Sequence, residues 1–255
     1  MGGTLPFDQL NEAPAGEEFG EFLREESQKI RFRSLKSWLD ERELNEEEKL
    51  LASFTYISGG FTTNVPETLF ENGITTLEAA VSDQELESLL GGTYSDTHRR
   101  RPDKTPIALR TFHQNINSTF TGFIGEIQEA EDPFNYGISR LTPSARNGGV
   151  DSFGRLAAFD WLETLVRVHH HDWLAPSSLR KDHLTSSDGP PAGFEEVFGI
   201  TLGEEYTEDC LDLVEQYAKD ELDLPDTKRV FEIESAFCNF QKSDGGEQEA
   251  AQSKC

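Results

Sequence analysis

The stretch FGRLAAFDWLETLVRVHHH, residues 153–171, has the clearest helical periodicity in the sequence. With each residue turned by about 100° from the one before, its apolar residues share one broad side: Ala157, Ala158, Trp161, Leu162, Leu165 and Val168. The polar residues take the opposite side: Arg155, Asp160, Glu163, Arg167 and His170. The pattern predicts an amphipathic helix over 154–170, with a buried apolar side and a ladder of alternating charge on the other.

The start of this helix carries the first candidate site residues. Gly154 has no side chain, so another backbone or a ligand phosphate can approach it closely. Arg155 is placed unfavourably, because the positive end of the helix dipole repels a cation, and we therefore expect an anionic partner. Two interpretations stay open. Either Arg155 and Asp160 line a cleft, or the polar side is a solvated ion ladder whose partners are structural.

The three histidines at the end of the stretch do not form a metal-binding pattern. Neighbours on a helix point about 100° apart, so His169, His170 and His171 cannot converge on one ion. No HExxH sequence is present. The sequence therefore predicts no metal site here, and it places His169 beside the apolar side as a packed residue.

Helical periodicity dominates the rest of the sequence, and alternating strand patterns are scarce. Turn-forming residues interrupt it at 91–106, 141–152 and 185–194. The predicted fold class is mainly α, with helices at 17–39, 46–57, 65–72, 83–90, 106–130, 154–170, 207–222 and 228–241. We expect one helical domain over 18–242, or two lobes divided near 141–152, between a flexible N-terminus (1–17) and a flexible acidic tail (243–255).

The composition sets limits on the class of protein. The 255 residues include 48 acidic and 23 basic ones, a formal net charge of −25. Acid spread along the chain is typical of a halophilic surface, and a surface for basic partners is the alternative. Three cysteines without metal-type spacing indicate a reduced, cytoplasmic protein. No apolar run is long enough to span a membrane, so we expect no membrane partner.

One dense positive cluster stands out against this acidic background. It lies in THRRRPDK, residues 97–104, and consists of His98, Arg99, Arg100 and Arg101, with Arg110 following on the next predicted helix. Arginines in a loop bind phosphate bidentately, which is typical of nucleic-acid or nucleotide sites. A surface loop that neutralises nearby acid explains the cluster equally well.

Two later segments complete the set of candidates. DGPPAGF, residues 188–194, lacks the Lys-Ser/Thr of a P-loop, so we interpret it as a plain turn rather than a phosphate loop. In RVFEIESAFCNFQK, residues 229–242, helical spacing places Glu234, Cys238 and Lys242 on one stripe. A thiol between a carboxylate and a lysine can form a small site, and simple burial of Cys238 is the alternative.

FGRLAAFDWLETL, LAPSSL, GPPAGF and EIESAFCNFQK, in this order over about residues 140–242, resemble the alpha-glutamyl/putrescinyl thymine pyrophosphorylases, also called amino acid:DNA transferases. The resemblance implies that an amine, either an amino acid or a polyamine, replaces pyrophosphate on a pyrophosphorylated 5-hydroxymethyluracil in DNA. At the matching positions it implies catalytic roles for Arg155, Asp160, Glu234, Cys238 and Lys242.

This chemistry agrees with the residue types. A departing pyrophosphate needs cations, which Arg155, Lys242 and the Arg99–Arg101 loop can supply. The incoming amine must lose a proton, and the carboxylate of Asp160 or Glu234 can accept it. The sequence requires no cofactor, although Mg²⁺ often accompanies pyrophosphate.

ITTLEAAVSDQELESLL (74–90) and FGRLAAFDWL (153–162) more weakly resemble the helix order of the helical DNA glycosylases, which implies a similar helical architecture. Their Gly-x-Gly hairpin is reduced here to Gly154, with GGV at 148–150 as a remnant, which argues against glycosylase activity and against hairpin-type DNA binding. A target base in a duplex has to leave the stack, and Phe153 and Trp161 are candidates to hold it. A non-catalytic nucleic-acid-binding protein, accessory to a defence system, is the main alternative to the transferase, and a glycosylase is the second.

Overall fold

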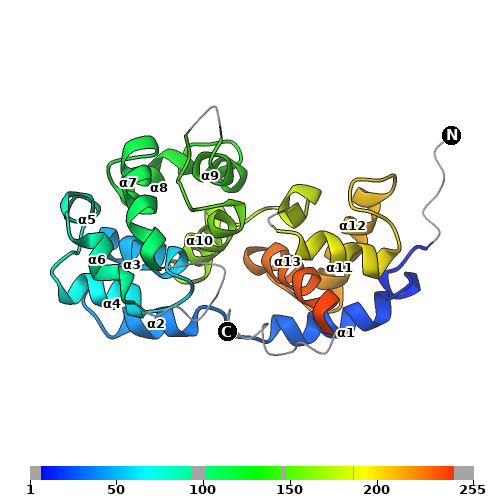
Figure 1. Cartoon of the computed structure of the whole chain (residues 1–255). Coiled ribbons are helices and arrows are strands. Elements are labelled where there is room, and N and C mark those ends of the chain that lie inside the picture. Colours follow the sequence, from blue (N-terminus) through cyan, green and yellow to red (C-terminus); the bar gives the residue numbers. More distant parts are fainter. Residues whose placement is uncertain (1–6, 94–101, 145–147, 186, 244–255) are drawn as a thin grey trace. The chain divides into compact units, whose positions relative to one another are not determined.

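The computed structural model describes residues 7–93, 102–144, 148–185 and 187–243. For residues 242 and 243 it describes the backbone alone. Within these residues the chain forms thirteen α-helices and four short 3-10 helices, with no strand (Figure 1). The prediction of a mainly α fold is confirmed. No helix in the described part is long and apolar enough to cross a membrane.

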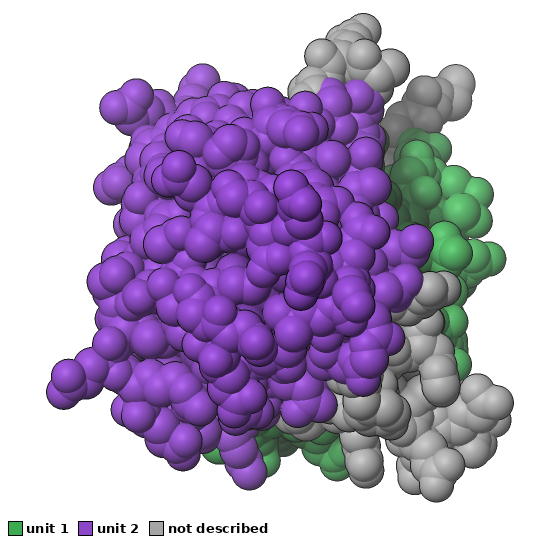
Figure 2. Space-filling model, turned by 60° about the vertical axis from the view of Figure 1, so that its left-hand side comes forward, with its two compact units in different colours: residues 1–30, 175–252 green, residues 31–174, 253–255 purple. Residues whose placement is uncertain are grey.

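The chain divides into two compact units, coloured separately in Figure 2. Of the described residues, unit 1 joins 7–30 with those from 175 to 243, and unit 2 takes those from 31 to 174. Residues 141–152, where the sequence offered a lobe boundary, lie inside unit 2. They are tied into it because the Val150 N–H donates to the Leu141 carbonyl at 2.9 Å and Val150 is fully buried.

Unit 2 contains the segment with which the sequence analysis began. Its elements are α2 (Arg33–Asp40), α3 (Glu46–Ser58), α4 (Asn64–Glu71), α5 (Leu77–Ser82), α6 (Leu86–Gly91), η2 (Pro102–Lys104), α7 (Thr105–Asn115), α8 (Phe120–Gln128), α9 (Pro133–Leu141), α10 (Arg155–Arg167) and η3 (Asp172–Leu174). Its core is aromatic. The Phe54 ring on α3 lies 4.7 Å from Phe153 and 5.2 Å from Trp161 between centroids. Each buried ring of this size contributes about 1.5–3 kcal/mol.

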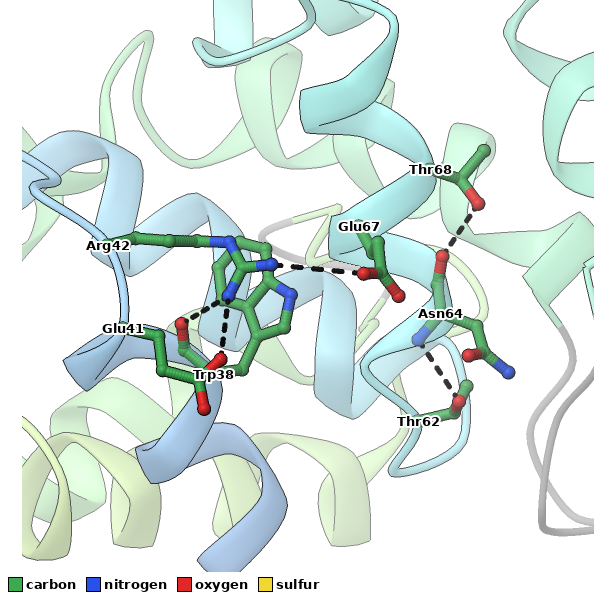
Figure 3. A network of polar contacts seen from close by, with 7 residues as sticks. All are labelled: Trp38, Glu41, Arg42, Thr62, Asn64, Glu67 and Thr68. Atoms are coloured by element: carbon green, nitrogen blue, oxygen red, sulfur yellow. Dashed lines mark hydrogen bonds and ion pairs between the residues drawn. The ribbon is translucent and has the colours of Figure 1, made fainter.

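A smaller polar and aromatic network joins α2 to α4 (Figure 3). The Arg42 guanidinium lies 4.1 Å from the centroid of the Trp38 ring and donates to the Trp38 carbonyl at 2.8 Å. Its ion pairs with Glu41 and Glu67 are longer, at 3.8 Å each. Both carboxylates are exposed, so the stacking on Trp38 contributes more than the ion pairs do.

Unit 1 is built from η1 (Leu10–Glu12), α1 (Gly16–Ser27), η4 (Lys181–Thr185), α11 (Gly189–Phe198), α12 (Thr207–Asp220) and α13 (Asp226–Ser243). The Phe19 ring of α1 stacks on Phe237 of α13 with centroids 4.4 Å apart. Within the N-terminal segment 1–17, whose flexibility stays a prediction, the structure describes the residues from 7 onward. Leu10 is buried in this core, because η1 folds back against α1.

The segment 188–194 is not the expected turn. It begins α11, whose Gly189 and Gly193 face α13 one helical turn apart. A Cβ atom on Gly189 would stand 2.8 Å from the Cys238 sulfur, so a larger residue there would require the Cys238 side chain to move. The prolines fit because the first turn of a helix does not need their missing N–H groups.

Two of the expected long helices are each broken in two. The segment 17–39 forms α1 and α2, separated at Phe32, whose φ of 55° is left-handed and which is fully buried. The segment 106–130 forms α7 and α8. The Thr119 hydroxyl accepts from the Gly122 N–H at 3.0 Å and starts the second helix as its N-cap. Tertiary burial and a local cap outweigh the continuous periodicity at these points.

Candidate DNA-binding and catalytic site

The start of α10 is open at the two residues that the sequence identified. Gly154 is the N-cap residue, is exposed, and has no side chain to cap the helix. A Cβ atom built on it would meet no atom within 4 Å. Arg155 follows as the first helical residue and is half-buried. Backbone N–H groups and a cation at one open helix start form an arrangement that can bind an anion.

The segment leading into α10, residues 148–154, is a tight turn that we call the entry turn. Gly148, Gly149 and Ser152 have left-handed φ values of 72°, 56° and 62°. Glycine is required at 149, because a Cβ there would stand 2.5 Å from the backbone of Pro143. Ser152 lies two residues before Gly154, where a Gly-x-Gly hairpin has its first glycine. The backbone bends there although the glycine is absent.

Asp160 and Glu163 on the polar side of α10 are buried, which contradicts the solvated ladder, one of the two interpretations that the sequence left open. Asp160, Glu163 and Thr164 have no exposed surface. Arg167 Nε lies 2.7 Å from Glu163 Oε1, and the Arg167 side chain is 9% exposed. Buried charges need partners, since desolvation is costly. Asp160 is therefore held in a protein environment rather than in water.

Phe153 and Trp161, the candidates for holding an extruded base, belong to the aromatic core. Both are fully buried. The Trp161 indole N–H donates to the Ser53 hydroxyl at 3.3 Å, which satisfies its only polar group. The base-holding role predicted for these two rings is wrong, because neither presents a face to a ligand.

The histidines lie beyond α10, which ends at Arg167 rather than at 170. The mostly buried His169 ring stacks parallel to His171 with centroids 6.3 Å apart. Burial lowers the pKa of His169 to about 3, so its imidazole is neutral. Burial also lowers the pKa of His171, although Glu46 opposes that shift from 3.5 Å away. Across the described residues, no three His, Cys, Asp or Glu side chains are grouped as metal ligands would be.

The C-terminal candidates lie on α13 in unit 1. Glu234 is fully buried and accepts from the Ser235 hydroxyl at 3.3 Å. Cys238, one turn later, is partly buried with its sulfur against the Gly189 backbone at the start of α11. Lys242 lies in the last turn of α13, and its side chain is outside the described residues. The predicted shared stripe of Glu234 and Cys238 agrees with their places on this helix.

The positive cluster contributes only one described residue. His98, Arg99, Arg100 and Arg101 lie outside the described residues, so their phosphate-binding role stays a prediction. Arg110 on α7 forms an ion pair with Glu87 on α6. A nucleic-acid contact by Arg110 would therefore compete with this carboxylate.

Sequence reasoning missed one cavity, which lies at the start of α12 in unit 1. It has a volume of about 190 Å³ and is lined by Lys181, Gly203, Glu204, Tyr206, Thr207, Glu208 and Asp209. The carboxylates around its mouth are exposed, and the Thr207 hydroxyl already accepts from the Gly203 N–H at 2.9 Å. The left-handed Tyr206 that shapes it carries no signal in the sequence.

The candidate catalytic residues form two sets. Arg155 and Asp160 belong to unit 2, at the open start and on the buried side of α10. Glu234, Cys238 and Lys242 belong to unit 1 and share α13. The catalytic roles of all five residues stay predictions. The structure describes the surroundings of each set within its own unit.

Comparison with protein families defines the class. The family model for amino acid:DNA transferases matches residues 24–248, a span that includes unit 2, most of unit 1 and both candidate sets. The chain belongs to the amino acid:DNA transferase family. The resemblance read from α10, α11 and α13 is thereby confirmed over a longer stretch than the motifs covered. No curated protein and no solved structure matches the chain.

Proposed function

We propose that the protein attaches an amine, either an amino acid or a polyamine, to a pyrimidine in DNA by displacing pyrophosphate from a pyrophosphorylated 5-hydroxymethyluracil. Membership of the family indicates transferase action on DNA with an amino acid as the second substrate. Our proposal adds that the leaving group is pyrophosphate and that the base is 5-hydroxymethyluracil. The observation that carries it is the open, uncapped start of α10 with Gly154 and Arg155.

The proposed step is a substitution at the methylene carbon on C5 of the base. The amine nitrogen forms a bond to this carbon as the carbon–oxygen bond breaks, and the bonding pair leaves with pyrophosphate. Arg155 stabilises the negative charge that develops on the leaving oxygen. The proton released by the amine passes to a carboxylate, for which Asp160 and Glu234 are our candidates.

A net charge of −25 opposes DNA over most of the surface, so binding has to be local. We assign one backbone-phosphate contact to the entry turn and the first turn of α10, where the N–H groups of a helix start and Arg155 lie together. The Arg99–Arg101 segment is a second candidate contact. High salt weakens both, so base stacking and shape would contribute most in a salt-rich cell.

The test is a direct assay in concentrated KCl, with and without Mg²⁺. The protein is mixed with an oligonucleotide carrying pyrophosphorylated 5-hydroxymethyluracil and with a panel of amino acids and polyamines. The nucleosides are then identified by mass spectrometry. We expect one amine adduct and released pyrophosphate, both lost in Arg155→Ala.

Arg33→Ala is the matched control, because Arg33 is likewise the first residue of a helix in unit 2 and is exposed. It should leave turnover unchanged. An unmodified base in the presence of folded wild-type protein would overturn the proposed reaction. Equal losses in the two variants would show that Arg155 has no specific role.

A further inference from the structure

Glu163 on α10 is a buried carboxylate with acceptor capacity that the described part of the chain does not use. It has no exposed surface. Its Oε1 atom lies 2.7 Å from Arg167 Nε, one helical turn later. This ion pair lacks the alignment of a hydrogen bond, and neither Oε1 nor Oε2 accepts one from a described residue.

Buried polar oxygens in proteins nearly always accept at least one hydrogen bond. Two other carboxylates of unit 2 follow this rule. Glu126 Oε1 accepts from the Tyr136 hydroxyl at 2.8 Å and from Arg140 Nε at 2.9 Å. Glu47 accepts from two backbone N–H groups at the start of α8. An unused acceptor costs stability, which a donor from outside the chain would recover at Glu163.

The surroundings of Glu163 indicate what kind of donor fits. The Thr164 hydroxyl is not available to Glu163, because it donates to the Asp160 carbonyl at 2.8 Å. Asp160 lies one turn before Glu163 and is also fully buried, so two carboxyl groups and one guanidinium lie on neighbouring positions of α10. A cationic donor is favoured, since hydrogen bonds between opposite charges are the strongest. A primary ammonium group supplies the charge and three N–H bonds.

We propose that Glu163 binds the amine substrate, with Oε2 accepting a hydrogen bond from its primary ammonium group; the inference rests on the transfer reaction proposed above. Bound there, the nitrogen lies within about one helical turn of Asp160, a candidate for taking its proton. Arg167 stays on Oε1 and orients the carboxylate. Because Glu163 has no exposed surface and the Arg167 side chain is 9% exposed, the structure has to open locally, which favours a small primary ammonium over a methylated one.

Glu163→Gln tests the site, because it keeps the shape of the side chain and removes its charge. Glu126→Gln is the matched control: Glu126 belongs to the same unit and is also paired with an arginine, but its Oε1 already accepts two hydrogen bonds. Glu163→Gln removes the charge with which Arg167 pairs. The double variant with Arg167→Met is therefore measured as well, and it replaces the single variant if that one does not fold.

The first measurement is the melting temperature of each protein as KCl is replaced by methylammonium chloride, or by tetramethylammonium chloride, at constant ionic strength. A ligand that binds the folded state raises the melting temperature. In the wild type and in Glu126→Gln, we expect methylammonium to raise it above the value in tetramethylammonium, which has no N–H. This difference should vanish in Glu163→Gln and in the double variant.

The second measurement is the KM for the reacting amine in the transfer assay. We expect it to rise about tenfold or more in Glu163→Gln, since a hydrogen bond between charged groups is lost. The kcat should change less, because the contact holds the amine before the reaction as well as during it. Glu126→Gln should match the wild type in both constants.

The outcomes separate this inference from the transfer reaction. A methylammonium effect that persists in Glu163→Gln or in the double variant, or that is missing in the wild type, would overturn the binding role of Glu163. An unchanged KM beside a lower melting temperature would show that Glu163 is only the structural partner of Arg167. A methylammonium effect that depends on Glu163, in a wild type that forms no amine adduct, would support the ammonium site and overturn the reaction.

Discussion

The backbone of Gly193 lies so close to Phe237 that a Cβ atom on this glycine would stand 2.0 Å from the Phe237 carbonyl oxygen. Gly193 is on α11 and Phe237 on α13, the helix that carries Glu234 and Cys238. The obstacle is backbone, which cannot rotate away as a side chain does. The glycines of GPPAG therefore set the distance between these two helices and, with it, the environment of Cys238.

Gly193→Ala should destabilise unit 1. Overpacking against a backbone atom costs about 2–3 kcal/mol, which a lower urea midpoint would report. Gly125→Ala on α8 is the control, because a Cβ there meets nothing within 4 Å and the residue is exposed. Alanine should stabilise that helix by about 0.5–1 kcal/mol. Equal midpoints for the two variants would contradict the close approach of α11 to α13.

Arg167→Met should be more damaging than replacing both members of its ion pair. Removing the cation leaves the Glu163 carboxylate buried without its counter-ion, which costs about 3–5 kcal/mol. Adding Glu163→Gln removes the charge and should recover most of that loss. The free energies of unfolding of both single variants and the double variant measure this coupling. Simple additivity of the two single effects would show that the pair does not stabilise α10.

His169 should make the protein sensitive to acid. Its pKa falls from 6.5 to about 3 on folding, so the folded state favours the neutral ring. This contribution is fully present above pH 6.5 and is lost as pH falls toward 3. At pH 4.5 about 2 kcal/mol of this contribution to the free energy of unfolding remains.

Replacing the imidazole tests this. His169→Phe should reduce the fall in melting temperature between pH 7 and pH 4.5, while His170→Asn, at an exposed left-handed position that asparagine tolerates, should leave it unchanged. The same acid sensitivity in His169→Phe as in the wild type would contradict a neutral, buried ring.

The sequence by itself determined the mainly α fold class and the family. Six expected helices match α3, α4, α6, α10, α12 and α13 within about three residues at their ends. α12 packs one apolar side, whereas α3, α10 and α13 are buried around almost their whole circumference. The motifs on α10, α11 and α13 sufficed for the family, since they are local strings of residue types that need no contacts to be read.

Only the tertiary structure decided what each polar side faces. Periodicity places Asp160 and Glu163 opposite the apolar side of α10, but their complete burial depends on what packs there. The start of α8 depends on Glu47 of α3, whose carboxylate accepts from the Phe120 N–H at 2.7 Å. The entry turn is held by Thr111 and Asn115 across some forty positions of sequence. Such contacts join distant residues, and no local pattern encodes them.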